Sequence, residues 1–258
     1  MPDPREYQTE AVVIKKIKLG EADRILTLYT RDHGKIEAVA KGVRRPKSKL
    51  AGHLELLTYT QIRLARGRNL DTIIGSQTID TFLPLKNDLW LTSYGLYAAE
   101  LVNQFNPQNS ANQSMFELLV ESLRRLSQAQ NSDLTLRYFE MRLLELSGYR
   151  PQLRECVACR TELKPEANTF CSAAGGALCP NCLYEEPDSF SISIDALKVL
   201  RFFQKNNFET VSRLKISVEL AGELKNLMAG YIRYILEKEV KSAVWLDSLS
   251  GQIDKPAA

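Results

Sequence analysis

The sequence has 258 residues, of which 44% are hydrophobic and 25% charged, a balance typical of a globular protein with one large or two modest domains. The polar start at residues 1–6 lacks a secretory pattern, and no run approaches the ~18 apolar residues that a membrane span needs. We therefore expect a cytoplasmic protein without a membrane partner, whose cysteines stay reduced.

The first eighty residues predict five short strands separated by turns. Alternating or β-branched apolar runs place them at residues 12–18, 25–30, 36–40, 54–64 and 72–79. Glycines 20, 34, 42, 52 and 67 mark the intervening turns. Five strands in this length favour a small closed barrel, and we expect an OB-fold domain at residues 1–80.

Beyond Pro84 the hydrophobic period becomes helical. It predicts helices at residues 85–105, 115–126 and 134–146, and a helix that Ser193 caps and that runs through Phe203. An apolar stripe from Leu220 to Ile235 predicts a last long helix. The fold class is therefore α+β and multidomain, with a helical domain at residues 81–247 and a flexible tail at residues 248–258.

Four of the five cysteines form two pairs, Cys156-x-x-Cys159 and Cys179-x-x-Cys182, separated by nineteen residues. Two such pairs supply a closed tetrahedral set of sulfur ligands for one structural zinc ion, in a loop-like module at about residues 150–188. Cys171 could replace a ligand or be a buried thiol, and the neighbouring Phe170 favours the second interpretation. Redox or disulfide chemistry fits two matched pairs less well.

The sequence offers no persuasive catalyst, and we expect a protein that is not an enzyme. His53-Leu54-Glu55 matches half of the zinc-deaminase signature, but no proline precedes the first cysteine of either pair, as that signature requires. Phosphate-binding P-loop, nucleophile-elbow and zinc-protease motifs are also missing from the sequence. His53 is more simply a residue of a turn or of a strand start.

Positive charge gathers in the amino-terminal segment, although the net charge is only +3. Residues 1–80 carry fifteen Lys and Arg against ten Asp and Glu, whereas residues 81–258 carry nineteen against twenty-one. The run from Lys41 to Lys49 holds five basic residues and no acid. A run this short is as typical of a solvated loop as of a binding site, but Arg63, Arg66 and Arg68 add to it.

Several motifs resemble the RecO family of bacterial recombination mediators. They include Gly20-Glu21-x-Asp23-Arg24, the run from Ala38 to Ser48, Arg66-Gly67-Arg68-Asn69-Leu70, and Gly148-Tyr149 before the first cysteine pair. The likeness extends over about residues 8–247 and so covers nearly the whole chain. The run Lys-Gly-Val-Arg-Arg-Pro-Lys-Ser at residues 41–48 is its most specific part.

The resemblance implies an amino-terminal OB domain, a helical domain with a four-cysteine zinc module, and a role in DNA repair and recombination. Members bind single- and double-stranded DNA, anneal complementary strands, and with RecR help RecA replace single-strand-binding protein (SSB), whose tail they contact. Such a protein acts in the cytoplasm, at the nucleoid. An OB-fold joined to a zinc ribbon in an RNA-binding or transcription-associated factor remains the alternative.

In this interpretation the basic side chains of the barrel hold DNA phosphates, with Arg44 and Arg45 the most important. The barrel sequence contains only three aromatic residues, Tyr7, Tyr29 and Tyr59, so we expect phosphate contacts to outweigh base stacking. The predicted DNA-binding residues are Arg24, Lys35, Lys41, Arg44, Arg45, Lys47, Lys49, Arg63, Arg66 and Arg68.

Overall fold

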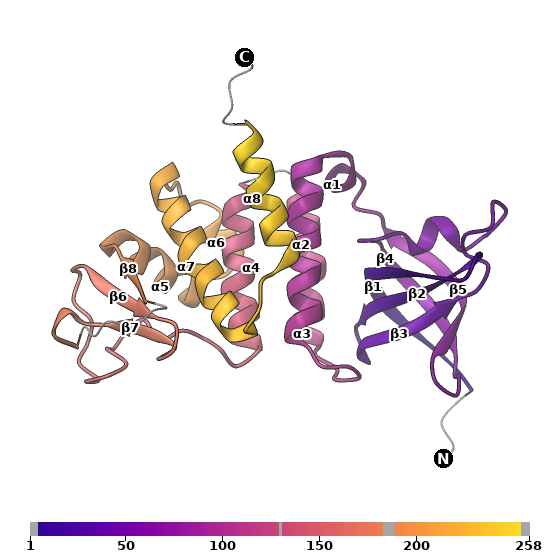
Figure 1. The fold of residues 1–258 in the computed structure, drawn as a ribbon, viewed down its shortest axis with the longest axis horizontal. Coiled ribbons are helices and arrows are strands. Elements are labelled where there is room, and N and C mark those ends of the chain that lie inside the picture. Colours follow the sequence, from indigo (N-terminus) through magenta and orange to yellow (C-terminus); the bar gives the residue numbers. More distant parts are fainter. Residues whose placement is uncertain (1–4, 129–130, 183–188, 254–258) are drawn as a thin grey trace. The chain divides into compact units, whose positions relative to one another are not determined.

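A computed structural model describes residues 5–128, 131–182 and 189–253 of the chain. It comprises two compact units, residues 1–129 and 130–258 (Figure 1). Residues 81–129, which the sequence places in the helical domain, are part of the first of these units. In the described ranges, no helix is both long and apolar enough to cross a membrane.

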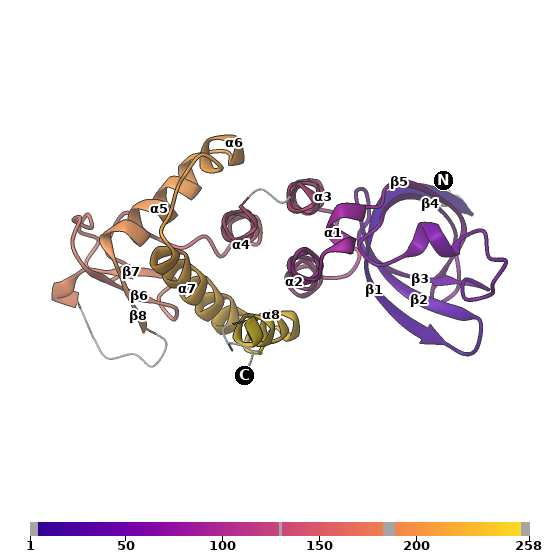
Figure 2. The same ribbon diagram turned by 90° about the horizontal axis from the view of Figure 1, so that it is seen from above.

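Five strands of the first unit close into a barrel, as the sequence predicts, and Figure 2 shows the strands encircling its interior. Around the barrel the order is β1-β2-β3-β5-β4, with β3 and β5 parallel and the other neighbours antiparallel. The strands are β1 (Glu6–Leu19), β2 (Asp23–Thr30), β3 (Gly34–Ala40), β4 (Tyr59–Ala65) and β5 (Asp71–Asp80). This topology confirms the OB-like fold class.

The long strand β1 closes the barrel because it pairs with two neighbours. Its first half, Glu6 to Val12, pairs with β4, and its second half, Ala11 to Leu19, pairs with β2. The register shifts between Val13 and Lys15, and such a bulge bends a strand and increases its twist. Alternate residues of the strands then point inward, and the buried core includes Ala11, Val13, Leu26, Leu28, Ile36, Ala38, Ala40, Ile62, Leu64 and Ile73.

The predicted strand start at Leu54 is wrong, because β4 begins at Tyr59. Residues Ala51–Leu54 form a 3-10 turn, and Leu57 adopts a left-handed backbone conformation with φ of 57°. Leu54 and Leu57 are both buried. The apolar run therefore places Leu54 in the barrel core and Leu57 beside Gly95, instead of alternating along a sheet.

Three helices complete the first unit: α1 (Leu83–Asn87), α2 (Leu89–Phe105) and α3 (Gln113–Ser127). The single helix predicted at residues 85–105 is interrupted at Asp88, whose extended backbone and carboxylate cap α2 through the amide of Leu91, at 2.9 Å. Gly95 allows α2 to approach the barrel, since a Cβ atom there would lie 2.9 Å from Leu57 Cδ1.

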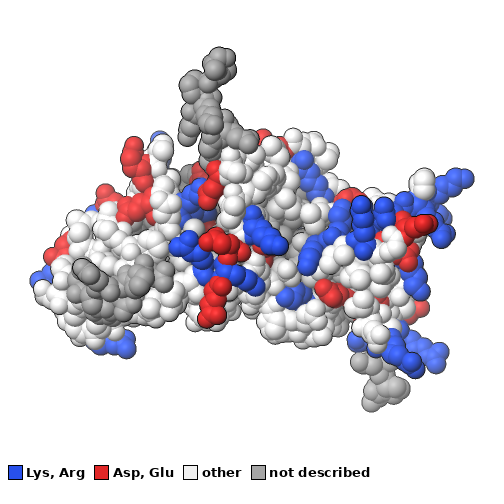
Figure 3. Space-filling view, in the orientation of Figure 1, with Lys and Arg blue, Asp and Glu red and all other residues white. Residues whose placement is uncertain are grey.

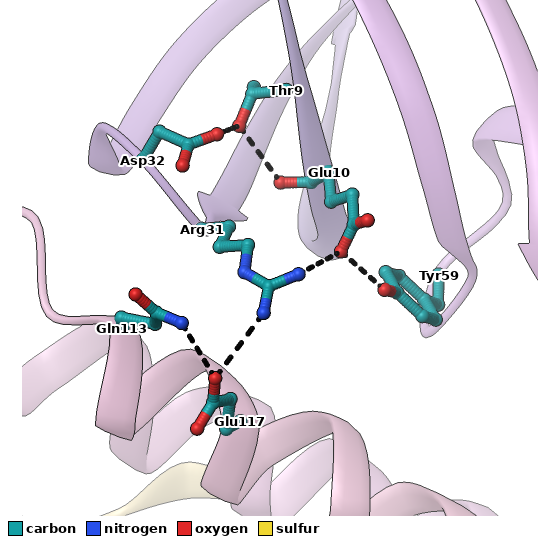
Figure 4. Close-up of polar contacts among 7 residues, drawn as sticks. All are labelled: Thr9, Glu10, Arg31, Asp32, Tyr59, Gln113 and Glu117. Carbon is teal, nitrogen blue, oxygen red and sulfur yellow. Dashed lines mark hydrogen bonds and ion pairs between the residues drawn. The ribbon is translucent and has the colours of Figure 1, made fainter.

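Polar contacts join α2 and α3 to the barrel. Arg31, after β2, reaches both Glu10 of β1 and Glu117 of α3, at 3.2 and 3.4 Å (Figure 4). The Tyr59 hydroxyl donates to the same Glu10, and the ring packs edge-on against Phe116 at 5.9 Å. Burial and this hydrogen bond raise the pKa of Tyr59 to about 12, so the hydroxyl remains a donor at neutral pH.

The second unit packs helices beside a small antiparallel sheet of order β7-β6-β8. Ser193 caps α5 through the amide of Ala196, as predicted. The sequence did not predict these short strands. Helix α8 extends into the segment at residues 248–258 that was expected to be a tail. Residues 183–188 and 254–258 lie outside the described residues. The elements are α4 (Ser132–Leu146), β6 (Asn168–Cys171), β7 (Gly176–Leu178), β8 (Ser189–Ile192), α5 (Ile194–Lys205), α6 (Phe208–Val211), α7 (Val218–Leu236) and α8 (Lys241–Ile253).

Candidate metal centre and nucleic-acid interface

The two cysteine pairs meet in the second unit. The sulfur atoms of Cys156, Cys159, Cys179 and Cys182 all lie within 4.8 Å of one another, and those of Cys159 and Cys179 are 3.8 Å apart. Four sulfurs bound to a central ion at about 2.3 Å lie about 3.8 Å apart in a tetrahedron. The cluster therefore has the dimensions of a closed four-sulfur metal site.

Local backbone geometry builds this cluster. The loop after Cys156 closes through a bond from the Arg160 amide to the Cys156 carbonyl, at 2.9 Å, and Val157 pairs with Ala177 of β7 at 3.0 Å. Gly176 is required at this crossing, because a Cβ atom there would lie 2.4 Å from the carbonyl oxygen of Gln152. The first cysteine loop is thus bonded to the strand that ends just before Cys179.

Hydrogen bonds shift the pKa values of the thiols. Burial opposes ionisation of Cys156, but amide donors that include those of Cys159 and Cys179 lower its pKa. Bonds from Thr161 lower the pKa of Cys159 to about 6. Hydrogen bonds of the Cys182 thiol with the sulfurs of Cys159 and Cys179, and to a smaller extent charge repulsion from Cys156, raise the pKa of Cys182 to about 12. A divalent cation at the centre would remove that repulsion and favour four thiolates.

Neither Cys171 nor His53 belongs to the cysteine cluster. Cys171 is buried in β6 and lies outside the set of four sulfurs, in agreement with its interpretation as a buried thiol. His53 lies in the 3-10 turn of the barrel, where its Nδ1 is 2.7 Å from Thr78 Oγ1. The half-signature of a zinc deaminase is therefore part of the first unit, whereas the cysteines belong to the second.

The ten basic residues predicted to bind DNA fall at two opposite ends of the barrel. Strand β1 pairs Lys18 with Arg24 near its last residue and Glu6 with Ala65 at its first residue. The turn between β1 and β2 and the loop between β4 and β5 therefore lie at opposite ends, which we call the β1–β2 end and the β4–β5 end. The predicted residues are Arg24, Lys41, Arg44, Arg45, Lys47 and Lys49 at the β1–β2 end, and Lys35, Arg63, Arg66 and Arg68 at the β4–β5 end.

At the β1–β2 end, the loop after β3 is fixed to the β1–β2 turn. The Arg44 amide bonds to the Ala22 carbonyl at 2.9 Å, and the Gly42 amide bonds to the carboxylate of Asp23 at 2.7 Å. The side chains of Lys41, Arg44, Arg45, Lys47 and Lys49 are exposed. The Arg44 guanidinium also donates to the Gly20 carbonyl at 3.2 Å, so this side chain is exposed but rests against the β1–β2 turn. A loop held by its backbone can thus present all five cations at this end of the barrel.

Strand β1 adds basic side chains that the sequence interpretation missed. Lys15 and Lys18 are exposed, and Lys16 forms an ion pair with Glu55, which also lies 3.4 Å from Arg24. Because Lys18 pairs with Arg24, these lysines lie beside the predicted cations of the β1–β2 end. The sequence alone could not show this, because it depends on the strand pairing. On the face that Figure 3 shows, a band of Lys and Arg accordingly runs over the barrel, beside scattered acidic side chains.

At the β4–β5 end, the four predicted residues differ in their surroundings. The Lys35 ammonium donates to the carbonyl of Asn103 at 2.6 Å, so it binds the end of α2. Arg63 is exposed and lies 4.0 Å from Glu6. Arg66 places its guanidinium carbon 4.6 Å from the centre of the Tyr7 ring, and Arg68 is exposed. Arg63, Arg66 and Arg68 therefore form the exposed part of this group.

Two of the three barrel tyrosines pack inside the first unit. Tyr29 is fully buried and its hydroxyl bonds to Asn106 at 3.0 Å, while Tyr59 bonds to Glu10. Among the described residues, the outward face of β2 and β3 between the two ends carries Ile25, Thr27, Glu37 and Val39 and no exposed ring. This face offers no aromatic platform for stacked bases.

Family models match both parts of the chain. The model described as Recombination protein O N terminal matches residues 1–82, and the one described as Recombination protein O C terminal matches residues 86–243. The chain belongs to the RecO family. The resemblance that its motifs indicate is thereby confirmed.

Relatives with the RecO name align over nearly the full length. The DNA repair protein RecO of Dehalococcoides mccartyi strain CBDB1 is 46% identical over 96% of this chain and 98% of its own. The DNA repair proteins RecO of Roseiflexus sp. strain RS-1 and Moorella thermoacetica are 40% and 32% identical, over 95% and 98% of this chain and 86% and 95% of theirs. The similarity thus extends across the barrel and the cysteine cluster alike.

Proposed function

We propose that this chain is a DNA repair and recombination mediator that binds single- and double-stranded DNA and anneals complementary strands. The observation that carries the proposal is the pair of exposed basic groups at the two ends of an OB-like barrel in a RecO-family fold. OB-folds bind oligonucleotides across strands 2 and 3 and through the loops at the two ends. In this chain Arg66 and Arg68 lie in the β4–β5 loop, and the loop after β3, which is bonded to the β1–β2 turn, carries the other exposed group of cations.

Phosphate contacts would supply most of the affinity. Lys and Arg neutralise phosphates and release condensed counterions, which gives binding without sequence preference. A strand that crosses β2, whose eight residues span roughly 25 Å, would meet Arg44 and Arg45 at one end and Arg66 and Arg68 of the β4–β5 loop at the other. Both single strands and duplexes present the phosphates that such a surface needs.

The composition of the β2–β3 face suits annealing. Ile25, Thr27 and Val39 offer no ring on which bases could stack, so a strand held by its phosphates keeps its base edges available for pairing. A surface that gripped every base would compete with the complementary strand. From the family resemblance, we further propose that this mediator passes DNA to RecA with the help of RecR.

The metal that we propose for the cysteine cluster is one structural zinc ion, held by Cys156, Cys159, Cys179 and Cys182. A set of four sulfurs suits zinc, and its closed tetrahedron leaves no position for a substrate. Zinc would cross-link the loop at Cys156–Cys159 to the turn at Pro180–Cys182. We accordingly propose a scaffolding role for the ion and no enzymatic activity for the chain.

A hollow on the second unit is a suitable site for the acidic, apolar tail of SSB. It has a volume of about 360 Å³, and the described residues that line it are Phe202 with Arg154, Lys198, Arg201 and Lys205, and the acid Glu162. Arg201 is fixed by bonds to the carbonyls of Leu153 and Leu163, at 2.7 and 3.2 Å. Four cations around one ring match a ligand that combines carboxylates with an aromatic or aliphatic end.

Annealing of complementary strands coated with SSB tests this function. The full chain should accelerate annealing, the double variant Arg44→Gln/Arg45→Gln should lose most of the acceleration, and Cys179→Ser should retain DNA binding. An RNA-binding or transcription-associated factor would instead prefer RNA over DNA of the same sequence and would leave SSB-coated strands unpaired. The recombination mediator that we propose would act in the bacterial cytoplasm, at the nucleoid.

A further inference from the structure

A cleft of about 400 Å³ opens at the β4–β5 end of the barrel. Its walls are the start of β1, the β2–β3 turn, the β4–β5 loop and the segment at residues 108–111. That segment is held in place by a bond from the Asn109 amide to the Lys35 carbonyl, at 2.9 Å. Gly34 permits the contact, because a Cβ atom there would lie 2.0 Å from the Ser110 carbonyl oxygen.

Three planar groups meet in this cleft. The rings of Tyr7 and His33 lie edge to face with centres 4.7 Å apart, and the Arg66 guanidinium lies 4.6 Å from the centre of the Tyr7 ring. Tyr7 is fixed by a 2.6 Å bond to Asp71, which also accepts from the Gly67 amide at 3.0 Å. The Tyr7 ring is therefore oriented before any ligand arrives, which lowers the entropy cost of binding.

The charges of the cleft disfavour a phosphate. Asp32, Glu37 and Asp71 line it, against one guanidinium. Three carboxylates would repel a phosphodiester, whereas a neutral nucleobase can stack on planar groups and hydrogen-bond to polar edges. The side-chain amides of Asn69, Gln108 and Asn109 supply both donors and acceptors to whichever base edge is present.

We propose that this cleft seats one unstacked nucleobase of a bound single strand, packed against the planar groups of Tyr7, His33 and Arg66. The inference rests on the proposed DNA binding, because the exposed Arg68, between the lining residues Arg66 and Asn69, would hold a neighbouring phosphate. One seated base would fix the position of a strand, while the bases along the ring-free β2–β3 face stay available for pairing. Amide groups make the seat tolerant of sequence.

The test compares an oligothymidylate of about 12 nucleotides with an abasic deoxyribose-phosphate chain of equal length and charge. By fluorescence anisotropy, the full chain should bind the thymidylate about tenfold more tightly than the abasic chain. A factor of this size is the affinity that one stacked base contributes. His33→Leu and Tyr7→Leu should each reduce this preference to about threefold or less, because each removes a ring. His53→Leu, the same change at the opposite end of the barrel, is the matched control, and thermal unfolding checks that all variants are folded.

Equal affinity of the unaltered chain for both oligomers, with a steep salt dependence, would overturn the base seat and leave the proposed phosphate binding intact. A loss of preference in His53→Leu as large as that in His33→Leu would also overturn it, since the base would then be bound elsewhere. Failure to bind either oligomer would refute the proposed DNA binding together with the base seat.

Discussion

The cysteine cluster and the basic barrel differ in how far the sequence alone determines them. Two residues between the cysteines of each pair, and one close crossing at Gly176, bring four sulfurs within 4.8 Å. The ten predicted DNA-binding residues, by contrast, are distributed over both ends of the barrel, because strand pairing decides where each lies. A metal site whose ligands are closely spaced in the sequence can be predicted from the sequence alone. A phosphate-binding surface can be predicted only when the order and pairing of the strands are known.

The two regions also lie in different compact units, which separates their expected roles. The cysteines and their strands are in the unit at residues 130–258, and the barrel is in the unit at residues 1–129. If the metal supports only its own unit, damage to the cluster should leave phosphate binding by the barrel unchanged. Damage to the basic loops should in turn leave the metal in place.

Removal of a metal ligand should give the largest effect. Cys179→Ser should release about one zinc ion per chain and expose residues 150–192 to proteolysis, because a structural zinc supplies on the order of 10 kcal/mol to its fold. Metal content by mass spectrometry and limited proteolysis measure the two outcomes.

Cys171→Ala is the matched control for that variant. Cys171 is buried but lies outside the cluster, so its variant should keep the metal. Equal loss of metal from both variants would show that Cys171 is a ligand or that the module collapses for another reason.

Loss of two cations at the β1–β2 end should give the next largest effect. Arg44→Gln/Arg45→Gln should lower DNA affinity about tenfold or more and reduce the slope of log affinity against log salt by about 2. Arg124→Gln/Arg125→Gln on α3 changes the charge equally at a place away from both basic groups. If this control weakens binding as much, net charge and not the basic loop carries the interaction.

The Tyr59 hydroxyl should matter for stability and not for DNA. Tyr59→Phe loses the bond to Glu10 and should destabilise the first unit by about 1 kcal/mol in denaturant unfolding. The salt slope of DNA binding should stay the same. A change in that slope would instead show that Tyr59 reaches DNA and that its burial against Phe116 is not its main role.

The ion pairs of Glu55 should give the smallest effect, and one that depends on pH. Burial acts to raise the pKa of Glu55, but the bond from Lys16 and the charges of Lys16, Arg24 and Lys86 lower it overall. A lowered carboxyl pKa stabilises the fold above the ordinary carboxyl pKa, and this contribution is lost as the pH falls through the lowered value. Glu55→Gln should therefore cost about 0.5 kcal/mol at pH 7 and nothing in strong acid, as measured by urea unfolding.

The sequence predicted those elements whose signal is local and strong. Alternation of apolar residues marked the barrel, and the Ser193 cap and the cysteine spacing marked α5 and the metal cluster. It failed where long-range packing decides the structure. Leu54 packs in the barrel core and Leu57 beside Gly95 of α2 instead of extending β4, and Asp88 caps α2 where periodicity alone suggests a continuous helix.

The binding surface was predicted only in part for the same reason. The charge of Lys35 is visible in the sequence, but its bond to the Asn103 carbonyl depends on how α2 packs against β3. Lys15 and Lys18 join the predicted cations only through the register of β1 and β2. The cleft around Tyr7, His33 and Arg66 combines four separate segments, so no short motif could reveal it.

The most direct test of the account is DNA affinity as a function of salt, measured for the unaltered chain and for Cys179→Ser side by side. If about six phosphate contacts form, affinity should fall roughly a thousandfold between about 50 and 200 mM salt, and the two proteins should give parallel lines. A nearly flat titration of the unaltered chain would contradict phosphate binding by the barrel. A slope that collapses in Cys179→Ser would contradict the separation of the metal centre from the DNA-binding surface.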